Sequence, residues 1–237
     1  IRTIMATNGG PNIIEDGLVF AVDAANKKSY PGSGTTWSDL AGNNNGTLIN
    51  GPTFDSANGG SIVFDGTNEY LNVSSSDIPP LEDYSSFTIN GWFKPSSSQA
   101  SNPYGVGAWL ALFCYANPTD NYLTLQRQAA TSTMVLYHAG GSASLGSIYS
   151  SIFSGAWVNV VLTFSSGNVV IYLDGSQLSS VSGISLGSPS SQFFRVFSER
   201  SILTTKGDFS NLSIYDRLLS STEITQNYNA LKGRFGL

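Results

Sequence analysis

Short segments with a two-residue alternation of apolar and polar side chains most constrain how this 237-residue chain can fold. The segment 86–94 is the clearest case: Phe87, Ile89 and Phe93 fall on one side of an extended chain, and polar residues with Trp92 fall on the other. That period of two is typical of a β-strand with one face on a core. The fold is therefore expected to be built from strands.

Similar segments recur along the chain between Gly, Asn and Asp turns. At Asp174-Gly175 the pair favours a tight type I′ hairpin, because both turn residues need a positive φ. Many short strands with such turns predict an all-β fold, an antiparallel two-sheet β-sandwich or jelly roll. The expected strands are 17–23, 61–64, 69–73, 86–94, 109–116, 121–127, 133–138, 157–164, 169–173, 193–197 and 209–215.

One short helix is expected near residues 221–232. Ser220 and Glu223 match a capping box, and Ile224, Tyr228 and Leu231 share one helical face. The sequence thus predicts one sandwich domain over residues 17–237, with a C-terminal helix docked on it. Residues 1–16 are polar and are expected to form an N-terminal arm that serves as an attachment segment, with a first edge strand as the alternative.

Charged residues make up only 11% of the chain, the net charge is −5, and the basic residues are scattered. Without a basic stripe to release counterions from phosphates, nucleic acid is not an expected partner. No apolar run reaches the roughly 20 residues of a membrane span, so membrane insertion is not expected either. A neutral, hydroxyl- and amide-rich surface suits a protein outside the cytoplasm or inside a large assembly.

The sequence offers few residues for catalysis. His138 is the only histidine and Cys114 the only cysteine, too few for a serine triad or a typical zinc site. Glycoside hydrolysis needs two carboxylates across one cleft, and no expected strand carries two acids spaced by two. Catalytic residues are therefore expected to be absent and the protein not to be an enzyme, with an atypical glycosidase as the last alternative.

Calcium is the one metal that the loops leave open, because it needs only oxygen ligands. Asp65 shares a turn with Asn68 and Glu69, and Asp23 ends the first expected strand. Asp23 and Asp65 are therefore weak candidates for a structural calcium, although an ordinary Asp-Gly turn is favoured at Asp65.

Aromatic and amide side chains form the strongest binding signal. If Leu110, Leu112 and Cys114 face the core, together with Leu123 and Leu125 of the next segment, the intervening residues face outward. Aromatic rings stack on the apolar faces of sugars, and amides bond their hydroxyls. Coverage of this face by loops or by a neighbouring subunit is the alternative. The candidate carbohydrate-binding residues are Trp109, Phe113, Tyr115, Tyr122 and Gln126.

Four stretches together resemble the laminin-G-like, concanavalin A-like lectin/glucanase superfamily: 61–73, 87–95, 157–175 and 212–224. The resemblance implies a jelly roll of two antiparallel sheets. It also implies binding of carbohydrate or protein, often with a structural calcium, and some relatives are glycosidases. Ser210-Asn211 stands where many relatives carry an acidic pair, which argues against a calcium site of that kind, and the acidic strand of the glycosidases is missing.

Both ends, 9–37 and 224–236, look like reading frames of marine tailed phages. This resemblance implies a non-enzymatic virion structural protein on the virion surface: a capsid decoration, fibre or tail adhesin displaying a lectin-like domain. The implied partners are other virion proteins through residues 1–16, further copies of the chain, and a cell-surface glycan. The alternative is an extracellular carbohydrate-binding module not tied to a virion.

Overall fold

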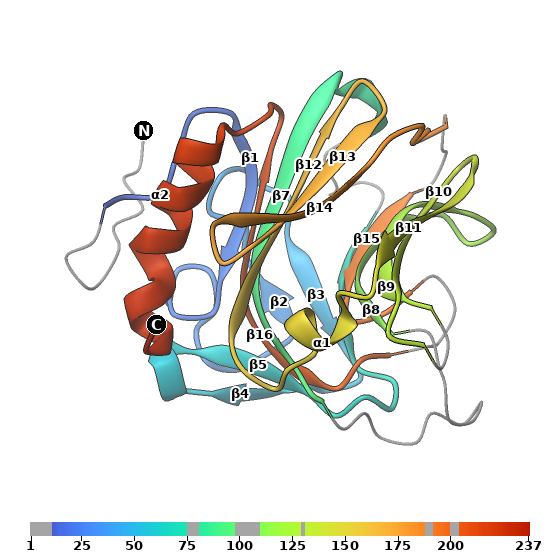
Figure 1. The fold of residues 1–237 in the computed structure, drawn as a ribbon. Helices are drawn as coiled ribbons and strands as arrows, with labels where there is room; N and C mark the ends of the chain where they lie inside the picture. The colour runs from blue at the N-terminus through green and yellow to red at the C-terminus, as the bar shows by residue number, and fades with distance from the viewer. Residues whose placement is uncertain (1–10, 75–80, 98–109, 129–130, 188–191, 200–203) are drawn as a thin grey trace.

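Two antiparallel β-sheets lie face to face in the computed structural model, with a C-terminal helix on the outer side of one sheet (Figure 1). The structure describes residues 11–74, 81–97, 110–128, 131–187, 192–199 and 204–237. The predicted all-β, two-sheet antiparallel sandwich is confirmed.

We call the sheet beneath the C-terminal helix sheet A. Its strands run in the order β14-β13-β12-β7-β16-β5-β4, and β1 also pairs with β16. Their bounds are β1 Leu18–Asp23, β4 Thr53–Asp55, β5 Ser61–Phe64, β7 Ser86–Pro95, β12 Val158–Ser165, β13 Asn168–Leu173, β14 Ser176–Val181 and β16 Gly207–Tyr215.

The opposite sheet, sheet B, has the order β11-β10-β9-β8-β15-β6-β3-β2. Its strands are β2 Thr36–Trp37, β3 Gly46–Ile49, β6 Tyr70–Val73, β8 Ala111–Ala116, β9 Asn121–Arg127, β10 Met134–His138, β11 Gly141–Gly146 and β15 Phe193–Val196. The helices are α1 (Tyr149–Ile152) and α2 (Ser221–Leu231), with 3-10 turns η1 (Ala57–Gly59), η2 (Leu81–Asp83) and η3 (Lys232–Phe235).

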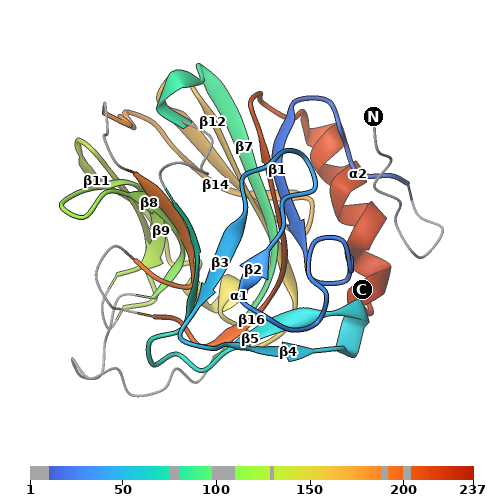
Figure 2. The same ribbon diagram turned by 180° about the vertical axis from the view of Figure 1, so that it is seen from behind.

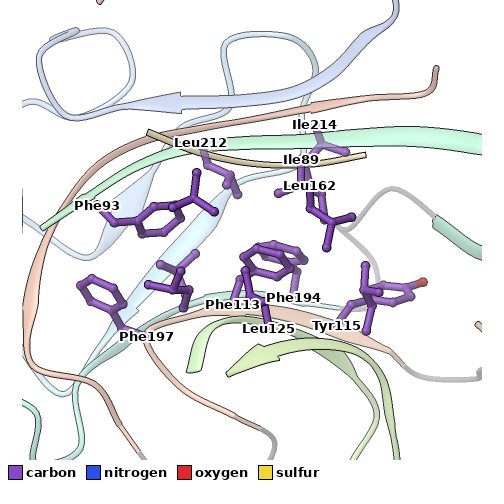
Figure 3. Close-up of a cluster of buried hydrophobic side chains, with 14 of the residues drawn as sticks. Ile89, Phe93, Phe113, Tyr115, Leu125, Leu162, Phe194, Phe197, Leu212 and Ile214 are labelled. Atoms are coloured by element: carbon purple, nitrogen blue, oxygen red, sulfur yellow. The ribbon is translucent and has the colours of Figure 1, made fainter. Parts of the chain in front are cut away.

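The core lies between the sheets and follows the period of two. Figure 3 shows Ile89, Phe93 and Leu162 of sheet A pointing toward Phe113 and Leu125 of sheet B. The predicted inward face of β7 is therefore confirmed.

The predicted hairpin is confirmed at the turn between β13 and β14. Asp174 and Gly175 have φ values of 50° and 80°, the left-handed pair that a type I′ turn requires. This turn sets the register of β14, an edge strand that the alternation pattern did not predict.

Helix α2 begins at the predicted capping box. The Ser220 hydroxyl accepts from the Glu223 backbone N–H, and the Glu223 carboxylate accepts from the Ser220 N–H at 2.8 Å. Ile224 is buried against the outer face of sheet A, and Tyr228 stacks on Trp92 of β7. Figure 2 shows α2 lying along this face from behind.

Part of the predicted arm lies on α2. The Asn227 Oδ1 accepts from the Ile14 N–H at 2.8 Å, and the Tyr215 hydroxyl donates to the Ile14 carbonyl at 3.0 Å. Gln226 donates to the Asn12 carbonyl at 2.9 Å. Residues 12–14 are thus attached to the domain, while residues 1–10 lie outside the described part. The attachment role of residues 1–16 stays a prediction.

Candidate functional site

The predicted orientation of two aromatic residues on β8 is wrong. Phe113 and Tyr115 are fully buried and face the core between the sheets (Figure 3). The pairing of β8 with β9 slips between Ala111 and Phe113, so that Leu112 is an extra residue on β8. Such a bulge sends every later side chain to the opposite face, and Cys114 consequently lies on the outer face. In this position Phe113 and Tyr115 do not reach a sugar.

The other residues of the predicted sugar-binding face lie in several different places. Leu123 and Leu125 of β9 point into the core as expected. Gln126 is on the outer face of sheet B but is buried, and its Oε1 has no hydrogen-bond partner within the described residues. Tyr122, predicted to face outward, is buried in the core cluster at the start of β9 and lines one side of a hollow. Trp109 lies outside the described residues.

One row of paired residues crosses the outer face of sheet B from edge to edge. Residues directly opposite each other on paired strands point to the same face. We call this the polar row, and it contains Thr36, Thr47, Asn72, Arg195, Cys114, Thr124, Tyr137 and Ser142. Cys114 and Thr124 at its centre are buried, whereas Thr36, Thr47 and Ser142 at its ends are exposed. Access to the row is therefore at the two ends.

Arg195 is held in place by intramolecular contacts. Its guanidinium lies over the rings of Phe193 and Tyr70, at 4.0 and 4.8 Å from their centroids. It also donates to the Asn72 Oδ1 and to the Glu199 carbonyl, both at 3.2 Å. These contacts give Arg195 a structural role that joins β15 to β6.

The other end of the polar row opens into a hollow of about 560 Å³. It lies where β9 begins and where β10 turns into β11. We call it the Tyr137 hollow. Its lining is aromatic, acidic and hydroxyl-rich and, in the part of the chain that the structure describes, lacks Lys and Arg. The lining residues are Thr119, Asp120, Tyr122, Tyr137, His138, Ala139, Gly141 and Ser142.

The two tyrosines of the hollow are neutral donors and acceptors. Burial raises the pKa of Tyr122, and the nearby carboxylates of Asp120 and Glu82 raise it further. Burial likewise raises the pKa of Tyr137. Asn117 donates to the Tyr122 hydroxyl at 2.8 Å, which fixes that ring. Both phenols stay protonated at neutral pH.

A turn before β9 positions the acid of the hollow. The Asn117 Oδ1 accepts from the backbone N–H groups of Thr119 and Asp120 at 2.8 and 2.7 Å. The Thr119 hydroxyl lies 2.9 Å from both the Asn117 Oδ1 and the Asp120 Oδ2. This Asn-centred turn places an exposed carboxylate beside two aromatic rings.

His138 contributes a further donor to the hollow. Its Nδ1 accepts from the N–H groups of Gly140 and Ser185 at 3.1 and 3.3 Å. A ring nitrogen that accepts carries a lone pair, so the proton of the neutral ring is on Nε2. These two bonds hold the imidazole ring in place and leave Nε2–H as a donor.

Tyr115 has a role that the sequence did not indicate. Its hydroxyl donates to the Glu82 Oε2, and the Gln192 amide donates to the Glu82 Oε1 at 2.6 Å. Burial and the Glu82 carboxylate raise the pKa of Tyr115 strongly. The contact ties η2 to the end of sheet B, next to the Tyr137 hollow.

The two calcium candidates lie in different surroundings. The Asp23 Oδ1 accepts from the Arg234 guanidinium at 2.8 Å and from the Ala25 N–H at 2.9 Å. The Asp65 Oδ1 accepts from the Thr67 N–H at 2.7 Å, as in an ordinary turn. In the described ranges, no three His, Cys, Asp or Glu side chains gather as metal ligands. A calcium site at either residue stays a prediction.

The helices supply no candidate for a membrane span. Over the residues that the structure describes, none is both long and apolar enough to cross a bilayer.

Comparisons with known proteins place this fold in a family. A family model described as "Concanavalin A-like lectin/glucanases superfamily" matches residues 65–225. The chain belongs to this superfamily. The lectin/glucanase resemblance predicted from four sequence stretches is thereby confirmed, whereas the phage resemblance of the two ends stays a prediction. Among curated proteins, none matches the sequence.

Several solved structures share the lectin/glucanase fold. A Trypanosoma rangeli sialidase in complex with 2,3-difluoro-KDN has a TM-score of 0.68 at 15% identity, over 98% of this chain and 37% of that one. The binding domain of Paraclostridial Mosquitocidal Protein 1 has a TM-score of 0.67 at 17% identity, over 91% of this chain and 52% of that one. The chain thus spans about a third to a half of these proteins, and the likeness concerns the fold alone.

These comparisons correct the prediction that the protein is not an enzyme. The superfamily includes glucanases by its description, and sialidases are among the structures with this fold. That prediction was based on the single histidine, the single cysteine and the lack of two acids spaced by two on a strand. The acid spacing is only one arrangement of carboxylates, and the sandwich itself does not exclude hydrolysis.

Proposed function

We propose that this chain is a glycan-binding domain and that the Tyr137 hollow binds a neutral sugar. The observation that carries the proposal is the convergence of Tyr122, Tyr137 and Asp120 on one hollow. Binding sites of this kind combine aromatic surface with a few fixed polar groups that set the orientation of the ligand. His138 and Ser142 add a donor and a hydroxyl.

The charge of the hollow favours neutral over anionic sugars. Among the described residues, its lining contains the Asp120 carboxylate and no Lys or Arg, and the whole chain has a net charge of −5. An anionic sugar would meet repulsion and would find no cation for its carboxylate. A neutral sugar can instead donate its hydroxyls to Asp120.

The family supports binding as the function. The superfamily description names lectins, and one solved structure of the same fold is titled a binding domain. Both observations concern other proteins, and the proposal for this chain rests on the hollow.

The test is calorimetric titration with neutral and sialylated oligosaccharides, chosen from hits on a glycan array. Tyr137→Ala should weaken the binding of the best neutral ligand about fivefold or more, because loss of one stacking ring costs about 1 kcal/mol or more. Thr47→Ala, at the far end of the polar row, is the matched control and should bind like the wild type. Binding of no glycan, or equal binding by Tyr137→Ala, would refute the proposal.

The same samples can be assayed for reducing ends. Release of sugar that is lost in Tyr137→Ala would indicate hydrolysis at this hollow, whereas stable binding without release would indicate a lectin-like function.

We further propose that the domain is displayed on a virion surface. Residues 1–16 would contact other virion proteins or further copies of the chain. This proposal is supported by the phage-like end segments and by the low charge. Residues 12–14 bind α2, so deletion of residues 1–10 should leave the domain folded while abolishing its incorporation into particles. Unchanged incorporation, measured by mass spectrometry of purified particles, would contradict the attachment role.

A further inference from the structure

The side chain of Arg234, in the last turn of the chain, is enclosed by oxygen atoms. Its Nη1 donates to the Asp23 Oδ1 at 2.8 Å, and its Nη2 donates to the Gly60 carbonyl at 2.6 Å and the Ser210 hydroxyl at 2.5 Å. Its Nε donates to the Asn58 carbonyl at 2.5 Å. The side chain is only 6% exposed. We call these four acceptor oxygens the Arg234 cage.

The cage is assembled from three segments that are distant in the sequence. Asp23 ends β1, Ser210 lies in β16, and Asn58 and Gly60 belong to the turn between β4 and β5. Figure 1 shows the C-terminus beside that turn, at the foot of α2. Convergence of three segments on one buried cation distinguishes this arrangement from a surface ion pair.

The backbone of the turn between β4 and β5 has a conformation in which two of its carbonyls point toward Arg234. Asn58 and Gly60 have φ values of 54° and 139°, both in the region that favours glycine. A Cβ at Gly60 would lie 2.5 Å from the Ala24 carbonyl, so only glycine fits there. The Asn58 amide, oriented to satisfy both its ends, accepts from the Trp157 Nε1 at 3.2 Å and donates to the Arg234 carbonyl at 3.3 Å.

The donor set is of the type that calcium uses. One carboxylate, two backbone carbonyls and one hydroxyl are hard oxygen ligands, and water can complete the six to eight that calcium takes. Here the positive charge comes from the chain itself. A partly buried carboxylate and inward carbonyls without a cation would be costly, which explains why the guanidinium contacts all four oxygens.

We propose that Arg234 is the resident cation of an oxygen-lined site of calcium type, and that this site binds a divalent cation once the guanidinium is removed. The intact chain then needs no metal at this junction. With a single carboxylate, the emptied site should bind calcium weakly, at about 10⁻⁴–10⁻³ M, the range of extracellular calcium modules.

The experiment compares the wild type with Arg234→Ala in EDTA and in calcium chloride. The melting temperature of Arg234→Ala should rise with calcium and that of the wild type should not. Terbium should bind Arg234→Ala with emission sensitised by Trp157, which contacts Asn58. Lys232→Ala, in the same turn, is the matched control and should behave like the wild type.

A second variant keeps the test decisive. Asp23→Asn added to Arg234→Ala should abolish the calcium response, because it removes the one carboxylate. If Arg234→Ala folds only poorly in EDTA, its refolding yield should recover with calcium. A folded Arg234→Ala with no calcium or terbium response, a refolding defect that calcium does not relieve, or an equal response of the wild type would each overturn the proposal.

Discussion

The ring of Phe235 stacks on the ring of Trp92, with centroids 4.3 Å apart and planes inclined by 23°. Trp92 is on the outer face of sheet A, and Trp157 lies against the same phenylalanine at 4.6 Å. The last turn of the chain therefore completes a small aromatic cluster between sheet A and α2.

Phe235→Ala should lower the free energy of unfolding by about 3 kcal/mol, because it leaves a cavity between two tryptophans. Urea titration followed by tryptophan fluorescence measures this directly. Leu237→Ala is the control, since Leu237 is 52% exposed, and it should change stability little. Equal effects of the two changes would argue against the cluster.

Glu223 should make stability depend on acid pH. The Arg217 guanidinium and the Ser220 cap lower the pKa of Glu223 from 4.5 to about 2. A carboxylate with a depressed folded pKa stabilises the fold fully above its unfolded value and loses this contribution as the pH falls toward the folded value. Wild-type stability should therefore drop between pH 4.5 and 2, and Glu223→Gln should flatten that drop.

The measurement is urea unfolding at several values of pH from 2 to 6. Asp83→Asn, which changes an exposed carboxylate in η2, should leave the wild-type profile in place. A Glu223→Gln profile parallel to that of the wild type would contradict the ion pair as its source.

Asp120→Asn should change the sugar preference of the Tyr137 hollow. Loss of a charged acceptor should weaken the binding of a neutral ligand about tenfold. Removal of the negative charge should at the same time improve the binding of sialylated ligands, and the improvement should shrink at high salt. Calorimetry at low and high ionic strength measures both affinities. An unchanged ratio of the affinities for neutral and sialylated ligands would contradict a role of Asp120 in sugar preference.

Tyr115→Phe should destabilise the chain by about 2 kcal/mol, because it leaves the Glu82 carboxylate without a charge-assisted donor. Hydrogen exchange in residues 81–84 should become faster, since the contact ties η2 to sheet B. Tyr172→Phe on β13 is the control. Unchanged exchange in residues 81–84 would mean that the contact does not hold this turn.

Much of the fold could be predicted from local patterns. Phe87, Ile89 and Phe93 face the core because alternation and burial agree on β7. The Ser220–Glu223 capping box marks the start of α2 and could also be predicted, because it is a contact between residues close in sequence. The Ser- and Gly-rich edge strands β11 and β14 were not predicted, because their sequences lack an alternation of apolar side chains and they are held by backbone pairing.

The candidate site was harder to predict. Around Leu112 the sequence is apolar on both faces, so no pattern reveals the bulge that turns Phe113 and Tyr115 inward. Tyr122 was predicted and lines the hollow, but Tyr137 and Asp120 join it only through the register of β9 and β10 and through the Asn-centred turn. The contact between Asp23 and Arg234 spans 211 positions and leaves no local signal.

The pairing of β16 has a consequence for the order in which the molecule assembles. This strand near the C-terminus pairs with β7, β5 and β1, so it joins the two halves of sheet A. Until it leaves the ribosome, β1 lacks its partner and the β4–β5 hairpin has no link to β7 in this sheet. Non-local pairing of this kind slows folding and leaves strand edges open to other chains. Nascent chains that stall before residue 207 are therefore the species most exposed to aggregation, and chaperone binding should concentrate on them.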